Sequence, residues 1–163
     1  MANSFAHPEF IVETHWLADR LNDPTVRVLD CTTHLMPPTK GGAYDVVSGR
    51  VDFEKGHILG AGFADIDNEL SDKNHRLHFM LPTAELFAAA IGKLGAGDNT
   101  KVILYSTANH WWATRCGGRY ACSGMKMQRC STVGFKNGLR SIRSHQGQYQ
   151  RRGGEWGQWP QRI

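Results

Sequence analysis

The chain changes character after Arg115, and this change limits how much of it can fold around a core. Residues 1–115 carry 10 Lys and Arg against 14 Asp and Glu, whereas residues 116–163 carry 9 basic residues and a single acid, Glu155. The second segment also holds 9 of the 18 glycines and few large aliphatic side chains. Such a segment cannot bury enough apolar surface to offset its chain entropy. We therefore expect one folded unit in residues 10–115 and a disordered tail, without a domain, in residues 116–163.

The first segment alternates strand and helix patterns. Lys101–Tyr105 is a continuous apolar run of the kind that is buried on both faces of a parallel sheet. Before it, apolar residues recur at intervals of three and four, with Thr83 placed to cap a helix and Gly95 or Gly97 placed to end it. We further predict a helix over 14–22 capped by Thr14, strands at 26–30 and 62–66, and mostly loop over 32–56. This alternation predicts an α/β fold with a parallel sheet covered by helices on both faces.

Composition excludes some classes of protein and leaves others open. No apolar run approaches the roughly 20 residues of a membrane-spanning helix. The N-terminus has no basic stretch followed by an apolar one, so we expect a cytoplasmic protein without membrane contact. The net charge of +4 comes from the tail alone. There Arg151 and Arg152 with Trp156 and Trp159 fit single-stranded nucleic acid, a function that we disfavour but leave open.

The loop after Tyr105 is the expected place for chemistry, because ligands of open α/β sheets bind at the carboxyl ends of the strands. Its residues are Ser106, Thr107, Ala108, Asn109, His110 and Trp111. A hydroxyl with His110 has the residue types of a hydrolytic pair, but no carboxylate is placed to orient the histidine. The sequence alone therefore assigns no catalytic residue in this loop.

Cysteines and histidines give no metal site by their spacing. Cys31 follows the strand at 26–30, and we interpret it as a small buried apolar residue rather than a reactive thiol. His57 is expected to satisfy backbone groups in its turn, and the remaining histidines of residues 1–115 are scattered. In the tail, the gaps between Cys116, Cys122 and Cys130 match none of the tight pairs that structural zinc sites use. We expect no metal and no cofactor.

Five stretches in register resemble the N-terminal domain of a two-domain rhodanese, a thiosulfate or 3-mercaptopyruvate sulfurtransferase. They are VETHWLADRLNDPTVRVLDCT, MPPT, FEKGHILGAGFADID, HFMLPTAELFAAAIGKLGAGDNTKVILY and WATR. Leu59 stands where the GHIPGA motif of the family has proline. The resemblance implies a rhodanese-like parallel sheet and transfer of sulfane sulfur from thiosulfate or 3-mercaptopyruvate to cyanide or a thiol.

The same resemblance implies that this chain alone is non-catalytic. In the family, a cysteine in the loop after the central strand carries the sulfur as a persulfide, and that cysteine lies in the second domain. The loop at 106–111 has no cysteine. A small sulfur donor is therefore an expected partner only if a second domain is present. A non-enzymatic rhodanese module that docks a partner is the alternative.

The sequence after WATR departs from the family pattern. The pattern continues as an RVWW helix, an FGH turn and a VLDGG strand, whereas this chain reads RCGGRYACSGMKMQRC. Restoring one G after the Arg115 codon, with choice only among synonymous codons, allows RVWWTIRVFGHEDAAVLDGGLQKWVA. We interpret residues 116–163 as an out-of-frame translation that truncates the domain near the start of the helix after residue 111. Val102, Ile103 and Leu104 are then expected to be partly uncovered, and the chain to be marginally stable.

Overall fold

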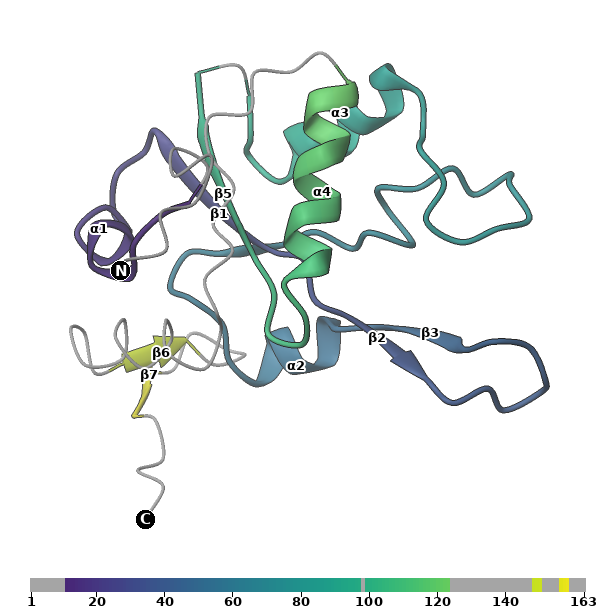
Figure 1. The fold of residues 1–163 in the computed structure, drawn as a ribbon. Coiled ribbons are helices and arrows are strands. Elements are labelled where there is room, and N and C mark those ends of the chain that lie inside the picture. Colours follow the sequence, from purple (N-terminus) through teal and green to yellow (C-terminus); the bar gives the residue numbers. More distant parts are fainter. Residues whose placement is uncertain (1–10, 98, 124–147, 151–155, 159–163) are drawn as a thin grey trace, which may run out of the picture.

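The computed structural model describes residues 11–97, 99–123, 148–150 and 156–158. Its centre is a three-stranded parallel sheet of order β4-β1-β5, formed by β4 (Gly62–Phe63), β1 (Val26–Asp30) and β5 (Lys101–Tyr105) (Figure 1). The two longer strands pair from Val26 with Lys101 to Asp30 with Tyr105, so both end at the same level. The predicted α/β class and these two strands are confirmed, while β4 is shorter than the strand predicted over 62–66.

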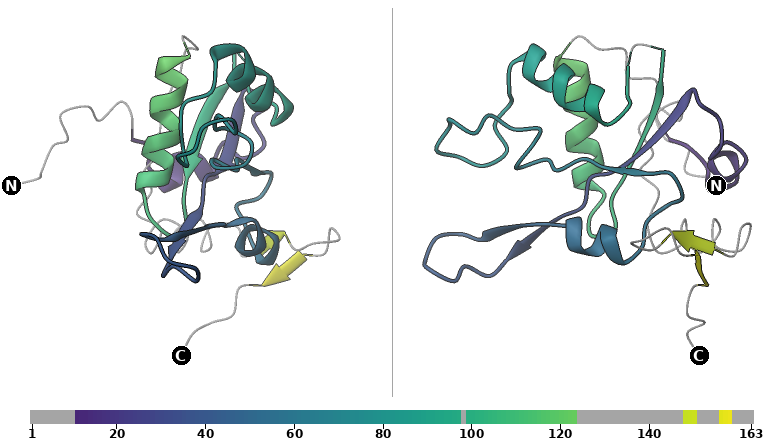
Figure 2. Two further views of the ribbon diagram at one scale, coloured as in Figure 1. Left: turned by 90° about the vertical axis from the view of Figure 1, so that its right-hand side faces the viewer. Right: turned by 180° about the vertical axis from the view of Figure 1, so that it is seen from behind.

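Helices cover both faces of the sheet, as predicted (Figure 2). On one face, α3 (Ala84–Lys93) and α4 (Trp111–Cys122) pack over Leu29, Val102 and Leu104. On the other face, Leu17 of α1 (Thr14–Ala18) packs with Val28 and Ile103. No helix among the described residues combines the length and the apolar character needed to cross a membrane.

The expectation that the faces of β5 are partly uncovered is wrong. Val102 is 2% exposed, and Ile103 and Leu104 are fully buried. The cover comes from α4, which does not stop near residue 111 but continues to Cys122 and brings Cys116 and Tyr120 into the core. The folded unit therefore extends past the predicted boundary at residue 115.

The structure describes only two short segments of the predicted tail beyond α4. A short antiparallel pair joins β6 (Gln148–Gln150) to β7 (Trp156–Gln158). Residues 124–147, 151–155 and 159–163 lie outside the described residues, and so do Cys130 and the arginine pair of the proposed nucleic-acid segment.

Helix α3 follows its sequence signals closely. The Thr83 hydroxyl accepts a hydrogen bond from the Leu86 N–H at 3.4 Å, which confirms the predicted N-cap. The helix ends at Lys93, and Gly95 then adopts a φ of +79°, a left-handed conformation that glycine enters without strain. Phe87 and Ile91 are the residues of this helix that are buried.

Two local predictions are wrong. The first helix begins at Thr14, has Glu13 as its N-cap without a side-chain hydrogen bond, and ends at Ala18 rather than at residue 22. The segment 32–56 is not mostly loop, because it forms β2 (Thr33–Met36), β3 (Asp45–Ser48) and α2 (Arg50–Lys55). The two strands pair as an antiparallel hairpin that projects from the body (Figure 1). The prolines and glycines between them form the end of this hairpin instead of marking an irregular stretch.

Tyr120 tests whether α4 belongs to the core beyond residue 115. Its ring is 2% exposed and meets the ring of Phe87 edge-on, with the centroids 5.1 Å apart. Tyr120→Ala is expected to lower the free energy of unfolding by about 3–5 kcal/mol, because a large buried ring leaves a cavity. Urea denaturation measures the change.

Gly118 on the same helix is the matched control. It is exposed, and no atom lies within 4 Å of the place where a Cβ would stand. Gly118→Ala is expected to raise the free energy of unfolding by about 0.5–1 kcal/mol through helix propensity. If Tyr120→Ala changes stability no more than Gly118→Ala does, α4 does not pack on the domain beyond Arg115.

Candidate functional site

The shared end of β1 and β5 brings the candidate site together. Because these strands are parallel and in register, Asp30 and Tyr105 lie side by side. Thr32 and the loop from Ser106 to Trp111 follow them directly along the chain. The loop therefore lies at the carboxyl end of the sheet, which is where the α/β architecture predicts a ligand site.

Thr32 is the side chain that ties the two strand ends together. Its hydroxyl donates to Asp30 Oδ1 at 2.5 Å, and its N–H donates to the same oxygen at 2.8 Å. The hydroxyl oxygen in turn accepts the Thr107 N–H at 2.8 Å. The side-chain oxygens of Thr107 and Ser106 lie 3.1 and 3.5 Å from it. Asp30 at the end of β1 thus holds Thr32, and Thr32 in turn holds the loop that follows β5.

The loop itself is a tight turn into α4. The Ser106 hydroxyl accepts the Asn109 N–H at 3.3 Å, and Asn109 Oδ1 accepts the Trp111 N–H at 3.0 Å, in the manner of a helix cap. Ser106 is 3% exposed, whereas the Trp111 side chain is 64% exposed at the first position of α4. The turn therefore buries its hydroxyl residue and presents an indole to the outside.

Burial dominates the electrostatics at this point. Asp30 is fully buried, and burial raises the pKa of its carboxyl, while the two hydrogen bonds from Thr32 act in the opposite direction. Burial also raises the pKa of the Tyr105 hydroxyl well above its ordinary value, and the nearby Asp30 adds to the effect. The Tyr105 oxygen accepts the Ile58 N–H at 3.3 Å. Asp30 is thus a buried carboxyl whose ionisation is opposed by its surroundings.

The arrangement does not form a hydrolytic centre. Among the described residues, no hydrogen bond joins His110 to Ser106 or Thr107, and the His110 ring instead lies edge-on to Trp111 at 6.2 Å. Sequence reasoning missed Asp30 and Thr32 as the residues that hold the loop. The signal was present as an acidic residue at the end of a buried strand with a threonine two positions later.

The predictions for Cys31 and His57 are confirmed. Cys31 is fully buried within the core that α3 and α4 cover. The His57 ring bonds the Phe53 carbonyl through Nδ1 at 2.8 Å and stacks on the Phe53 ring at 3.9 Å between centroids. The part of the chain that the structure describes contains no cluster of three or more metal-ligating side chains.

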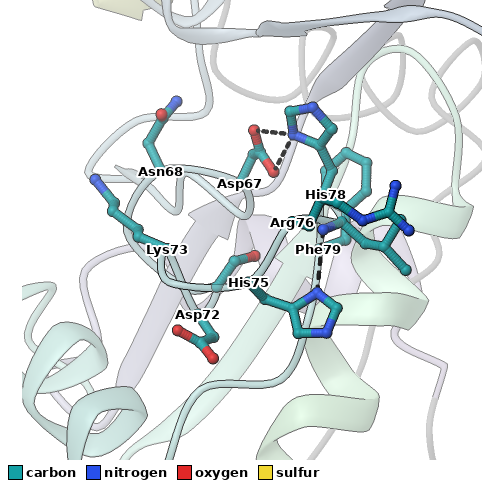
Figure 3. Close-up of a pocket in the computed structure, with 10 residues that line it drawn as sticks. Asp67, Asn68, Asp72, Lys73, His75, Arg76, His78 and Phe79 are labelled. Atoms are coloured by element: carbon teal, nitrogen blue, oxygen red, sulfur yellow. Dashed lines mark hydrogen bonds and ion pairs between the residues drawn. The ribbon is translucent and has the colours of Figure 1, made fainter. Parts of the chain in front are cut away.

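A separate polar pocket of about 200 Å³ lies within the loop from Asp67 to Phe79 (Figure 3). One wall is the pair of His78 and Asp67, whose Nδ1 and Oδ2 atoms are 3.0 Å apart. Phe79 has a φ of +63°, which is unusual for a side chain of this size. Arg115 and Arg119 of α4 hold it there, since both donate to the Phe79 carbonyl, at 2.8 and 2.7 Å. No residue of the loop at 106–111 lines this pocket.

The fold and the site together define an α/β domain in which the loop at 106–111 lies at the carboxyl end of a parallel sheet, where such domains bind ligands. No family model matches the chain. It is 34% identical over 125 residues to human 3-mercaptopyruvate sulfurtransferase, covering 69% of this chain and 39% of that protein. It is 32% identical over 130 residues to the sulfur carrier protein TtuD of Thermus thermophilus, covering 80% and 39%.

Solved structures give the same result. SseA from Escherichia coli, a 3-mercaptopyruvate sulfotransferase with the rhodanese fold, superposes with a TM-score of 0.64 at 28% identity, over 81% of this chain and 49% of that one. The chain belongs to the rhodanese family and matches an N-terminal rhodanese domain. It spans 39% of the length of the human and Thermus relatives.

The pH dependence of stability tests the buried state of Asp30, which holds Thr32 and through it the loop at 106–111. Because burial raises its folded-state pKa, its contribution to stability is fully present below the unfolded-state pKa and is lost as the pH rises through the folded-state pKa. Asp30→Asn keeps an acceptor for Thr32 and removes this titration. As the pH rises from 4 to 7, we expect the parent chain to lose stability that Asp30→Asn does not lose. The free energy of unfolding of the variant minus that of the parent chain is therefore expected to increase.

Denaturant unfolding at a series of pH values measures this difference. Asp72, which is in the polar loop and partly exposed, is the control, since Asp72→Asn has no buried carboxyl to neutralise. A gap between Asp30→Asn and the parent chain that stays constant with pH would contradict the buried, hard-to-ionise state of Asp30.

Proposed function

We propose that this chain is a non-catalytic N-terminal domain of a rhodanese-type sulfurtransferase. The whole protein moves sulfane sulfur from thiosulfate or 3-mercaptopyruvate to cyanide or a thiol. The observation that carries the proposal is that the loop at the carboxyl end of the sheet has Ser106 in its first position and contains no cysteine.

The chemistry of sulfur transfer needs a thiolate at such a loop. A thiolate attacks the outer sulfur of thiosulfate, whose S–S bond breaks as sulfite leaves, or the sulfur of 3-mercaptopyruvate, whose C–S bond breaks as pyruvate leaves. The transferred sulfur then remains on the cysteine as a persulfide, which a serine or threonine oxygen does not form. Ser106 is also 3% exposed and already accepts the Asn109 N–H. Its hydroxyl supports the turn into α4 rather than facing a substrate.

The other described cysteines do not replace the missing thiol. Cys31 and Cys116 are fully buried in the core. Cys122 is exposed, but it is the last residue of α4, whereas the loop ends at Trp111, the first residue of that helix. A helix of 12 residues is about 18 Å long at 1.5 Å per residue, which separates the two ends.

Exposed apolar side chains on α4 and on the hairpin support a docking role for this domain. Trp111 is 64% exposed at the start of α4, and Leu35 and Met36 are 46% and 49% exposed on the hairpin that follows β1. Exposed large apolar side chains of this kind can take part in an interface. The curated relatives are longer than this chain, so a second, catalytic domain is the partner that we propose for this surface.

The nature of the acceptor remains part of the proposal. One relative is a sulfur carrier protein, which favours a protein thiol as the physiological acceptor over a small molecule. The third function considered from the sequence, nucleic-acid binding by the basic tail, has no support in the described part of the chain.

The first test of the proposal is enzymatic. The purified 163-residue chain is expected to form no thiocyanate from thiosulfate or 3-mercaptopyruvate with cyanide, because no accessible thiol lies at the loop. Intact-mass measurement after incubation with thiosulfate is expected to show no added sulfur at Cys31. Thiocyanate formation that Cys31→Ser abolishes would move the active site to the end of β1 and overturn the proposal.

We also propose that the native continuation after Arg115 is the restored reading frame, which a second version of the chain tests. This version keeps residues 1–115 and continues as RVWWTIRVFGHEDAAVLDGGLQKWVA. It adds a strand segment and large apolar side chains, each worth about 1.5–3 kcal/mol when buried, so its thermal unfolding is expected to be sharper and to occur at a higher temperature. Equal or less cooperative unfolding than that of the present chain would identify the present tail as the native continuation.

A further inference from the structure

The part of α4 that follows Arg115 carries most of the unpaired buried polar atoms of the described chain. Among the described residues, three buried side-chain polar atoms have no hydrogen-bond partner: Asp30 Oδ2, Arg119 Nε and the Tyr120 hydroxyl oxygen. Two of these three lie within residues 116–123. A buried polar atom without a partner costs stability, so native cores contain few of them. The backbone is helical and packed here, but two of its inward side chains do not suit their surroundings.

The electrostatics at these two positions point the same way. The terminal nitrogens of Arg119 donate to neutral oxygens, at 3.1 Å to Ser71 Oγ and at 2.7 Å to the Phe79 carbonyl. Burial, followed by the repulsion from Arg115, lowers the pKa of Arg119. Burial also raises the pKa of the Tyr120 hydroxyl. Both shifts oppose the charged form, so the surroundings of this part of α4 favour uncharged side chains.

A pocket of about 110 Å³ lies between the start of α3 and the end of α4. Its wall on the α3 side is apolar and consists of Leu81, Pro82, Ala84 and Phe87. Its wall on the α4 side consists of Arg119, Cys122 and Ser123. The apolar wall thus faces one cation and two small side chains, which leave the space between the helices unfilled. Protein interiors are normally close-packed, so larger apolar side chains at the end of α4 would suit this wall better.

The restored reading frame places aliphatic side chains at these positions whichever synonymous codons are used. The first arginine of the restored sequence is Arg115 itself, so its second residue replaces Cys116. The added G followed by the TG of a cysteine codon gives GTG, which encodes valine at position 116. The last base of any arginine codon followed by the TA of a tyrosine codon encodes isoleucine, leucine or valine at position 120. In the same way, position 122 becomes valine, leucine or methionine.

We infer that the surface of the sheet and of α3 that α4 covers is built for an apolar helix, with aliphatic side chains at positions 116, 120 and 122. Cys116 and Tyr120 occupy the inward face of α4, and Cys122 lines the pocket that the apolar residues of α3 enclose. The inference rests on the proposed reading frame. It does not depend on the proposed sulfurtransferase activity, which thiocyanate formation tests separately.

Tyr120→Phe and Tyr105→Phe form a matched pair that tests the misfit. Each removes one buried hydroxyl and keeps the ring, but only the Tyr105 hydroxyl has a partner, the Ile58 N–H. Tyr120→Phe is expected to raise the midpoint of urea unfolding, and Tyr105→Phe to lower it, each by roughly 0.5 M. A midpoint of Tyr120→Phe at or below that of the parent chain would show that the hydroxyl is satisfied where it lies, and the inference would be rejected.

A combined variant tests the apolar face as a whole. It introduces four residues of the restored sequence into the present 163-residue chain: Cys116→Val, Arg119→Thr, Tyr120→Ile and Cys122→Val. These changes remove both unpaired polar atoms of α4 and add aliphatic groups to the inward face and to the pocket. The midpoint of urea unfolding is expected to rise by roughly 0.5–1 M relative to the parent chain.

The control places aliphatic groups on the outward face of the same helix. Thr114 and Ala121 are exposed, so a variant with Thr114→Val and Ala121→Ile is expected not to raise the midpoint. A combined variant that is no more stable than the parent chain rejects the inference, and so does a control variant that gains as much. None of these substitutions changes a residue of the loop at 106–111, so either outcome leaves the test of the proposed sulfurtransferase role unaffected.

Discussion

The in-register pairing of β1 with β5 is the interaction on which the rest of the molecule depends. Because Asp30 pairs with Tyr105, both strands end together, and the chain leaves each of them at the same edge of the sheet. Thr32 then reaches from one strand end to the Thr107 backbone and to the Asp30 carboxylate. A shift of one residue would separate these groups and turn the alternating side chains of β5 to the wrong faces. The loop geometry and both cores therefore follow from a single register.

The cores on the two faces explain which parts of the fold were predictable. Strand β5 carries a continuous apolar run and helix α3 a capped three–four repeat, and the structure has both where the sequence predicts them, as it does the short strand β1. The hairpin of β2 and β3 was missed because its prolines and glycines are the residues of its turn, and composition over the whole segment hid the pairing. Helix α1 ends at Ala18 because the chain continues in turns, with the Arg20 N–H donating to the Leu17 carbonyl and the Asp23 N–H to the Arg20 carbonyl. Leu21 still packs against the same core, so the apolar spacing predicted a buried segment but not its conformation.

The sequence predicted where the candidate site lies but not which side chains hold its loop. The rule that ligands meet the carboxyl ends of parallel strands placed the loop correctly at residues 106–111. What holds the loop is a contact between Thr32 and Thr107, which are far apart in the sequence, and no single-segment pattern reports such a contact. In the same way, composition alone placed the end of the folded unit at residue 115. It could not show that Cys116 and Tyr120 fall on the inward face of a helix that begins before that point.

The backbone of Phe79 links two parts of the molecule that are otherwise unrelated in sequence. Its left-handed conformation is held by two arginines that sit one turn apart on α4. When α4 unwinds, both of these hydrogen bonds are lost, and the backbone at Phe79 is released to the ordinary region of conformational space. The polar loop from Asp67 to Phe79 has hydrogen bonds of its own, such as that from the Asp72 N–H to the Met80 carbonyl, but its conformation at Phe79 depends on α4. We therefore expect this end of the loop to lose its order when α4 unwinds.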